Sequence, residues 1–519
     1  ITFTATLGGL LFGYDTAVIS GTVKSLQAFF IDGLTDHSQQ ALGVVFQFRA
    51  VIALVVLAIA LILSSLLFRM YARKKAWIIA SLLMVLVVAA VLVYYFQPAV
   101  IDENMLSSIK GFTVSSALVG CITGGALAGR VSTSLGRKKG LLLAAFLFAL
   151  SAIGSALPDR INVFGTADII SFIIYRIIGG IGVGLASMLS PMYIAEIAPA
   201  RMRGKLVSWN QFAIIFGMLI IYFVNYFIAR GRPQEWIDTI GWRWMFASEL
   251  VPAGLFLVAL FFIPETPRYL VMIHKEEKAS SILGKLNGKE KVAGILQSIR
   301  ESFKVKSNLW LFYGWGVIII GILLSVFQQF VGINVVLYYA PEIFRTLGEG
   351  TDSALLQTII VGAINLLFTV VAIMTVDRFG RKVLMITGAL VMAVSMFALG
   401  TVFYKQGAGI VALVFMLGYI AGFAMSWGPV TWVLLSEIFP NSIRGAMAIA
   451  VAAQWLANLL ISWTFPILND SSWLTLRFNH GFAYWIYGLM GILAALFVWK
   501  FVPETKGKSL EEIEKIWKA

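Results

Sequence analysis

The sequence has few cysteines, histidines and charged residues, and each shortage excludes a class of protein. Cys121 is the single cysteine among 519 residues, so no disulfide bond can form within the chain. The three histidines (His37, His274 and His480) lie far apart and form no metal-binding motif, and no Ser/His/Asp arrangement indicates an enzyme. We therefore expect no metal, no cofactor and no catalysis. Only 13% of the residues are charged, which is too few for the surface of a water-soluble protein.

Long apolar stretches are abundant instead, and hydrophobic residues make up 59% of the chain. A helix needs about 20 apolar residues to span the hydrocarbon core of a bilayer. Stretches of that length predict an all-α integral membrane protein with about fourteen spans. They lie near residues 3–30, 50–68, 76–97, 111–129, 140–157, 169–193, 206–229, 244–263, 309–330, 354–376, 383–404, 409–435, 446–468 and 481–502.

The net charge of +14 would suggest an acidic partner in a soluble protein, but here its distribution follows membrane topology. When the spans alternate from a chain that starts inside, most of the 40 lysines and arginines fall in loops on the cytoplasmic side. We therefore expect both termini in the cytoplasm, a lipid bilayer as the surroundings and no nucleic-acid partner.

Three motifs occur twice, in the same order and about 240 residues apart. Such spacing indicates two similar halves arranged in parallel, and in membrane proteins of this kind the working part is the cleft between the halves. The motif pairs are Gly136-Arg137-Lys138 with Gly380-Arg381-Lys382, 195–204 with 436–445, and Pro264-Glu265-Thr266 with Pro503-Glu504-Thr505.

The repeat divides the chain into a first half at 1–264, a polar linker at 265–307, a second half at 308–504 and a tail at 505–519. The linker mixes charged and apolar residues at helical spacing, which predicts amphipathic helices on the cytoplasmic side; a regulatory lid is the alternative. The first half holds two extra spans, an inserted hairpin at about 46–97. We expect this hairpin at the lipid-facing periphery without contact to a substrate; a surface for a partner or an oligomer is the alternative.

Several segments carry a family resemblance. They are Pro191–Pro199 followed by Arg203-Gly204, Pro264–Arg268, Gln328–Asn334, Gly380-Arg381-Lys382 and Pro503–Gly507. Together they resemble the sugar-porter branch of the major facilitator superfamily, and bacterial D-xylose/proton symporters in particular. The resemblance implies the major facilitator fold, in which two six-helix bundles give alternating access to a central sugar site. It also implies a multi-pass protein of a bacterial inner membrane that functions as a monomer, with a monosaccharide and H+ as partners.

Charged residues in the repeated loops are, by the same resemblance, expected to pair across the halves and to close the cytoplasmic side as a gate. They are Glu196, Arg203, Arg381, Glu437 and Arg444. Ordinary positive-inside topology is the alternative explanation of the basic residues in these loops. Thr133 stands where many relatives carry Asp or Asn, so the cluster of the first half departs from the family pattern.

Amide and indole side chains inside predicted spans are the candidates for binding a sugar. Gln and Asn offer a donor and an acceptor on one uncharged head, and indole offers a flat apolar surface with one donor. By resemblance, the residues that hydrogen-bond the sugar are Gln211, Gln328, Gln329, Asn334, Trp432 and Gln454, with Asn365 in the same polar set, and the walls are Phe12, Tyr338 and Trp455. The alternative is that these amides hold helices together.

Gln328 and Asn334 are six residues apart and point to different faces of a straight helix. They converge only if the helix is broken, and we expect the break at Gly332. Met218 lies about two turns from Gln211 on the same face, where the xylose symporters carry glutamine. We therefore expect a more apolar pocket and an altered sugar preference.

Asp15 lies about 18 Å along the first span and needs a partner or a proton there. Arg176 and Glu249 lie in later spans of the same half. A neighbouring arginine favours the carboxylate form of Asp15, and a dry pocket without it favours the protonated form. By resemblance, Asp15 is the protonation site, Arg176 its switchable partner and Glu249 a modulator. A static buried ion pair is the alternative.

The sequence thus predicts a proton-coupled symporter that imports D-xylose, or a related pentose or hexose, by alternating access. A proton-independent hexose facilitator is one alternative, which Asp15 disfavours because facilitators of this kind carry a neutral residue there. A transporter-like sugar sensor is the other, although such sensors usually have longer cytoplasmic tails.

Overall fold

The computed structural model describes residues 2–35, 39–98, 100–198, 202–303, 313–407, 409–439, 441–507, 512–513 and 517, and these residues form helices and short connections. His37, the last residues of the predicted linker and most of the predicted tail lie outside the described residues.

The first half begins with a broken helix and continues mainly with long helices, with short helices between some of them. Its elements are α1 (Thr2–Val18), η1 (Ile19–Gly21), α2 (Val23–Phe30), η2 (Asp32–Thr35), α3 (Gln39–Met70), α4 (Arg73–Tyr95), α5 (Glu103–Ser134), α6 (Arg137–Ala156), α7 (Asp168–Ile197), α8 (Arg203–Ala229), α9 (Gln234–Trp236), η4 (Ile237–Gly241), α10 (Trp242–Ala247) and α11 (Leu250–Phe261).

The linker folds into short helices, and the second half repeats the long ones. The linker elements are α12 (Pro267–Met272), α13 (Glu276–Asn287), η5 (Lys289–Lys291) and α14 (Val292–Ser302). The second half consists of α15 (Gly316–Phe330), α16 (Ile333–Thr346), α17 (Thr351–Phe379), α18 (Arg381–Tyr404), α19 (Gly409–Met425), α20 (Trp427–Ile438), η6 (Asn441–Ala446), α21 (Met447–Asn469), α22 (Ser472–Phe478) and α23 (Phe482–Phe501).

Thirteen helical segments among the described residues are long and apolar enough to cross a membrane. This agrees with the predicted all-α membrane protein. The first predicted span is divided, since α1 has 17 residues and continues through the short helices η1 and α2. α1 nevertheless packs against α7 and α8 inside the bundle. The total of about fourteen spans therefore stays a prediction.

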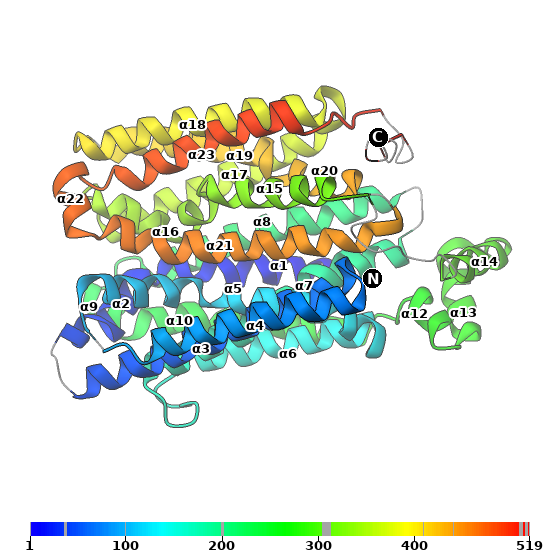
Figure 1. Cartoon of the computed structure of the whole chain (residues 1–519), viewed down its shortest axis with the longest axis horizontal. Coiled ribbons are helices and arrows are strands. Elements are labelled where there is room, and N and C mark those ends of the chain that lie inside the picture. The colour runs from blue at the N-terminus through cyan, green and yellow to red at the C-terminus, as the bar shows by residue number, and fades with distance from the viewer. Residues whose placement is uncertain are drawn as a thin grey trace.

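The helices run side by side in two bundles (Figure 1). In the first, α5 and α6 pack on α7 and α1 packs on α8; in the second, α18 packs on α19 and α23, and α15 packs on α21. The bundles meet where α5 packs on α21 and α8 packs on α17. Both chain termini and the linker helices lie at one end, which we call the α12–α14 end, and α2 and α22 lie at the opposite end, the α2–α22 end (Figure 1).

Small residues let the helices approach closely at these crossings. A Cβ atom at Gly13 of α1 would overlap the carbonyl oxygen of Ile214 on α8, and one at Gly111 of α5 would overlap the carbonyl oxygen of Trp463 on α21. Lipid tails are as apolar as the helix surfaces, so close van der Waals packing rather than hydrophobic burial holds such helices together.

The inserted hairpin, α3 and α4, lies at the edge of the first bundle. α3 packs on α5 and α7, whereas the apolar segment of α4 is only 11% buried, the lowest value of the thirteen. This placement matches the expected periphery. The turn between the two helices also reaches the second half, because the rings of Tyr71 and Trp315 lie 6.2 Å apart.

The repeated motifs of the first half meet in one cluster at the α12–α14 end. The carboxylate of Glu265 accepts hydrogen bonds from the backbone N–H groups of Arg137 and Lys138, at 3.1 to 3.2 Å. These groups belong to the first turn of α6 and have no partner within the helix. The Arg137 guanidinium in turn pairs with Glu196 at 2.8 Å.

The second half builds the same cluster from its own copies. Glu504 accepts from the backbone N–H groups of Arg381 at 3.1 Å and Lys382 at 3.0 Å, which begin α18. Arg381 pairs with Glu437 at 2.9 Å. Motifs far apart in the sequence therefore recur because each half needs an anion at a helix N-terminus and a partner for the adjacent arginine.

Two polar contacts between the bundles lie at the α2–α22 end. The Lys110 ammonium of α5 pairs with Asp470, which directly follows α21, at 2.8 Å. Nearby, the Trp463 indole N–H of α21 donates to the backbone carbonyl of Ser108 at 3.0 Å. The bundles are thus held together at this end.

We predict that Glu504→Ala lowers the free energy of unfolding by about 1 kcal/mol, the usual cost of losing an N-terminal helix cap. Burial raises the pKa of Glu504, but hydrogen bonds from the backbone N–H groups of Lys506, Lys382 and Arg381 outweigh burial and leave this pKa below its usual value. A carboxyl with a lowered pKa in the folded state stabilises the fold above its unfolded pKa, and this contribution is lost as the pH falls through the folded pKa. The difference between variant and wild type should therefore shrink in acid.

Thermal unfolding of the detergent-solubilised protein at several pH values measures this difference. Glu277→Ala is the matched control, since Glu277 is exposed on α13, and it should unfold like the wild type. A Glu504→Ala variant that unfolds like the wild type at neutral pH, or with the same deficit at every pH, would contradict the capping role.

Candidate functional site

A buried ion pair joins α1 to α7 inside the first bundle. The Arg176 guanidinium donates through Nη1 to Asp15 Oδ1 at 2.6 Å and through Nη2 to the Asp15 backbone carbonyl at 3.0 Å. The side chains are 1% and 0% exposed, and the ring of Phe246 lies 5.4 Å from the guanidinium carbon. Asp15 Oδ2 and Arg176 Nε have no hydrogen-bond partner among the described residues. The pair is therefore buried but not fully satisfied.

A second buried carboxyl, that of Glu249, lies beside this pair. Glu249 stands between α10 and α11, where the helix is interrupted. The hydroxyl groups of Tyr14 and Ser248 are 2.8 Å apart and connect α1 to this interruption. As a result, the Glu249 carboxyl lies within hydrogen-bonding reach of Asp15. Neither Glu249 oxygen receives a hydrogen bond from an N–H or O–H group of the described residues.

We call Asp15, Arg176 and Glu249 the carboxyl cluster. Its two carboxyl groups and one guanidinium carry a net charge of −1 when all are ionised, which is costly in a site without water. Two carboxyl groups can hydrogen-bond to each other only when one of them carries a proton. The cluster is therefore suited to taking up and releasing one proton. The structure brings together all three residues predicted for coupling, and their role in coupling stays a prediction.

The predicted break in the helix that carries Gln328 and Asn334 is confirmed. α15 and α16 are separated at Gly332, whose φ of +93° lies in the left-handed region that favours glycine. A Cβ atom at this position would lie 2.8 Å from the ring of Tyr487. The break brings the Asn334 amide to that of Gln329, the neighbour of Gln328.

The amides of this segment form a hydrogen-bonded chain. Asn334 Nδ2 donates to Gln329 Oε1 at 2.5 Å, and Gln329 Nε2 donates to Gln328 Oε1 at 3.4 Å. Gln328 Nε2 donates to the backbone carbonyl of Trp427 at 2.8 Å, which joins α15 to the start of α20. These amides thus also hold helices together, as the alternative explanation proposed, while Asn334 remains partly exposed.

Aromatic side chains from the two halves face each other. The rings of Phe12 on α1 and Trp455 on α21 have centroids 5.8 Å apart. Gln454 precedes Trp455 and is buried, and its Oε1 has no partner among the described residues. Tyr338 on α16 is hydrogen-bonded to Asn458, and α16 packs against α1, the helix that carries Asp15. This part of the predicted sugar site therefore lies on a helix that neighbours the predicted coupling site.

The remaining predicted sugar residues are distributed over three helices. Gln211 and Met218 lie on α8, Asn365 on α17 and Trp432 on α20; Met218 and Asn365 are buried, and the other two are partly exposed. Among the described residues, none of the four makes a hydrogen bond or ring contact with another predicted sugar residue. Their place in a sugar site stays a prediction.

The expectation that gate residues pair across the halves does not hold for the ion pairs that the structure describes. Glu196 pairs with Arg137 at 2.8 Å, and Glu437 pairs with Arg381 at 2.9 Å, each within its own bundle. The reason is the capping of α6 and α18, which positions each arginine beside the glutamate of its own half.

Two further predicted gate residues, Arg203 and Arg444, have side chains outside the described residues. The charged contact between the bundles that is described, Lys110 with Asp470, lies at the opposite α2–α22 end. That the five residues form a gate therefore stays a prediction. The two ion pairs described for Glu196 and Glu437 each lie within one half.

Sequence reasoning missed several residues that organise the site. Arg137 is the partner of a predicted gate glutamate, and the repeat would have revealed it, since Arg137 corresponds to Arg381. Tyr14 and Ser248 each precede a carboxyl of the cluster by one residue, but nothing in the sequence indicates that they meet. Asn458 lies one turn after Gln454 on α21 and carries the same kind of signal, an amide inside an apolar span.

The whole chain is similar to known sugar transporters. A family model described as sugar (and other) transporter matches residues 1–99 and 91–517. A D-xylose-proton symporter of Escherichia coli (strain K12) is 54% identical over 531 aligned residues, which cover 100% of this chain and 95% of that protein. A glucose facilitated diffusion protein of Zymomonas mobilis subsp. mobilis is 43% identical over 432 residues, which cover 82% and 91%.

Solved structures show the same likeness. The inward-open conformation of the xylose transporter XylE from E. coli superposes with a TM-score of 0.79 at 52% identity, covering 100% of this chain and 99% of that one. XylE bound to 6-bromo-6-deoxy-D-glucose, described as a proton:xylose symporter of the major facilitator superfamily, has a TM-score of 0.73 at 54% identity, covering 99% and 98%.

Gly332→Ala tests the helix break. A methyl group at this φ is strained by about 1–2 kcal/mol and also meets the Tyr487 ring, so we predict a loss of about 2 kcal/mol or more in the free energy of unfolding. Gly254→Ala is the control, because its Cβ atom meets nothing within 4 Å inside α11. Thermal unfolding of both variants measures the effect. Equal stability of the two variants would show that the break does not depend on glycine.

Proposed function

The chain belongs to the sugar (and other) transporter family, and from this premise we propose that it is a proton-coupled symporter importing D-xylose, or a related pentose or hexose, by alternating access. The observation that carries the proposal is the buried pair of Asp15 and Arg176 with Glu249 beside it. An ionisable cluster inside a membrane protein is costly, and proton relays are one of the functions for which such clusters are retained. A facilitator that only equilibrates sugar has no need of it.

Proton coupling follows from the charge balance of the carboxyl cluster. While Asp15 is ionised, Arg176 is held by two hydrogen bonds from α7 to α1. Protonation of Asp15 removes the charge attraction, so Arg176 is free to turn away and the contact between the two helices weakens. Because α16, which carries Tyr338, packs against α1, the change reaches the wall of the sugar site.

Sugar binding follows from the position of the aromatic wall and the amides. Phe12 and Trp455 belong to different halves, so a sugar ring seated against them contacts both bundles at once. The amides around the break at Gly332 offer paired donors and acceptors that match sugar hydroxyl groups. The unpartnered oxygen of Gln454 is a further acceptor on the second-half side. A ligand that binds both halves favours the conformation in which they approach each other.

We assign the α12–α14 end to the cytoplasm of a bacterium and the α2–α22 end to the periplasm, in a protein of the inner membrane that functions as a monomer. The basic loops and linker at the α12–α14 end support this orientation. In this orientation, the Lys110–Asp470 pair closes the periplasmic side. The likeness to an inward-open structure supports a state that is closed on the periplasmic side and open to the cytoplasm.

Proteoliposomes with and without an imposed pH gradient test the proposal. The wild type should accumulate labelled D-xylose only when a gradient is present. Asp15→Asn cannot take up a proton, so we predict that it abolishes accumulation while sugar exchange between the two sides continues. Asp159→Asn, at an outer loop where Asp159 pairs with Arg243, is the matched control and should accumulate sugar like the wild type.

Three results would contradict the proposal. Accumulation by Asp15→Asn would show that the carboxyl cluster does not couple proton and sugar. Equilibration by the wild type without accumulation would indicate a facilitator, and absence of flux for every sugar in a panel would indicate a sensor.

Met218 is expected to set sugar preference. An amide at this position adds a hydrogen bond to a sugar hydroxyl group, worth about 1 kcal/mol or about fivefold in affinity. We therefore predict that Met218→Gln raises the ratio of D-xylose to D-glucose uptake several-fold. Met202→Gln is the control, since Met202 is exposed at the start of α8. Uptake ratios that do not differ between Met218→Gln and the parent protein would rule out this role.

A further inference from the structure

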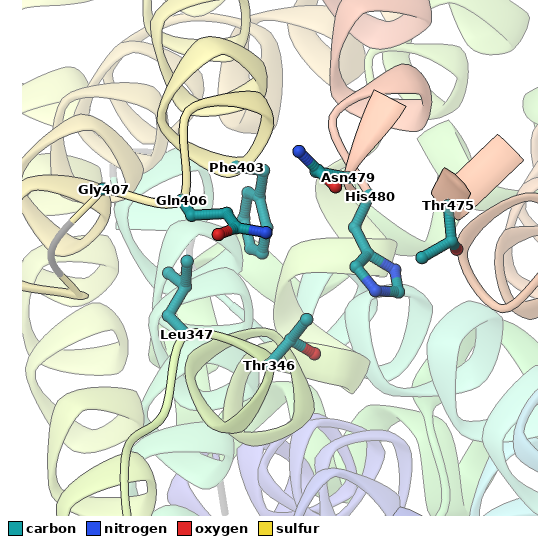
Figure 2. A pocket seen from close by; sticks show the side chains of 8 residues that line it. All are labelled: Thr346, Leu347, Phe403, Gln406, Gly407, Thr475, Asn479 and His480. Atoms are coloured by element: carbon teal, nitrogen blue, oxygen red, sulfur yellow. The ribbon is translucent and has the colours of Figure 1, made fainter. Parts of the chain in front are cut away.

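A cavity of about 310 Å³ opens at the α2–α22 end, within the second half (Figure 2). Its walls come from the end of α16, the end of α18 and the segment around α22. Thr346 and His480 face each other across it, with Thr475 beside His480 and Gln406 opposite (Figure 2). Its size falls at the lower end of the range of small-ligand sites, about 300–1,000 Å³.

The backbone around this cavity is strained. Five non-glycine residues of the described chain have positive φ, and three of them line it: Gln406 (53°), Asn479 (45°) and His480 (65°). Outside glycine, and to a lesser degree asparagine, this conformation costs about 1–2 kcal/mol per residue. Such strain persists where the surroundings enforce it and gathers at ligand sites. Asn479 is the C-cap of α22, a position that commonly adopts this conformation, so the cost falls on Gln406 and His480.

Several of the polar groups that line the cavity are available to a ligand. His480 Nδ1 lies 2.7 Å from the backbone carbonyl of Asn469, which can only accept, so Nδ1 donates to it and Nε2 is left for a ligand. The Gln406 amide has no side-chain hydrogen bond among the described residues and offers both a donor and an acceptor. Asn479 uses its amide N–H on the Tyr404 carbonyl, which leaves its oxygen as an acceptor.

This combination fits a polyhydroxylated, uncharged ligand. Amide, imidazole and the hydroxyl groups of Thr346 and Thr475 can each exchange hydrogen bonds with sugar hydroxyl groups, and Phe403 adds an apolar wall. No carboxylate, ammonium or guanidinium group lines the cavity, so nothing in it would compensate the charge of an ionic ligand.

We propose that this cavity is a second binding site for a neutral monosaccharide on the outer face of the transporter. Thr346 lies twelve residues after Asn334 on α16, so the two sites are separated by about 18 Å along the helix axis. The proposal rests on the proposed function, which supplies the outer face and the class of ligand.

Binding of labelled D-xylose to the full-length protein in detergent, measured by equilibrium dialysis, tests the site. The wild type should bind D-xylose at two classes of site with different affinities. Gln328→Ala/Gln329→Ala, which removes amides of the central site, should retain the weaker class. Adding Gln406→Gly/His480→Gly should weaken that class at least tenfold. Because glycine accepts positive φ without strain, these two substitutions should leave the unfolding temperature unchanged or raised, so lost binding cannot be ascribed to unfolding.

Phe164→Gly/His274→Gly is the matched control. Both residues also have positive φ and neither lines the cavity, so this variant should keep both classes of binding. Binding of one equivalent by the wild type, or residual binding that survives Gln406→Gly/His480→Gly, would overturn the second site and leave the proposed function standing. No D-xylose binding by the wild type would contradict the proposed function itself for this sugar.

Discussion

A charged group inside a membrane protein must be paired or neutralised, because the surrounding hydrocarbon offers no water to solvate it. The interior of this protein is arranged around that requirement. Asp15, Arg176 and Glu249 are fully or almost fully buried, and only one carboxylate oxygen of the three residues receives a hydrogen bond from the guanidinium. One proton shared between the Asp15 and Glu249 carboxyl groups would supply the missing partner. The helix that carries Glu249 is interrupted at this point, and the Tyr14–Ser248 contact ties the interruption to α1.

The need to pair buried charges and free helix N–H groups also explains the repeated motifs, which lie at the ends of long helices. Each half begins one long helix with Gly-Arg-Lys, and a Pro-Glu-Thr segment from the end of that half supplies a carboxylate for the free N–H groups. The arginine then pairs with the glutamate of the third motif. Three motifs that look independent along the chain are therefore one structural unit, used once in each bundle. The two halves are therefore alike in this unit. The three residues of the carboxyl cluster, by contrast, all belong to the first half.

Much of the fold and part of the candidate site followed from the sequence. Helical spans followed from the length of apolar runs, and the break at Gly332 followed from the six-residue spacing of Gln328 and Asn334. The first span is divided, and the described ion pairs of Glu196 and Glu437 lie within their own halves, because spacing along a chain does not say which charged loops come together. The gate itself stays a prediction. The sequence placed Gln211, Asn365 and Trp432 correctly inside helices. No described contact joins them to the other predicted sugar residues.

The sequence by itself determined that this is a helical membrane protein of two repeated halves, because apolar length and motif spacing are local properties of the chain. It also determined which residue types stand inside spans, and so which side chains need a partner. Only the tertiary structure decided which residues those partners are. Asp15 meets Glu249, 234 residues away, through the Tyr14–Ser248 contact, and Gln406 meets His480 across a cavity formed by three separate segments. Long-range packing of helix ends sets these neighbours, and no local pattern encodes it.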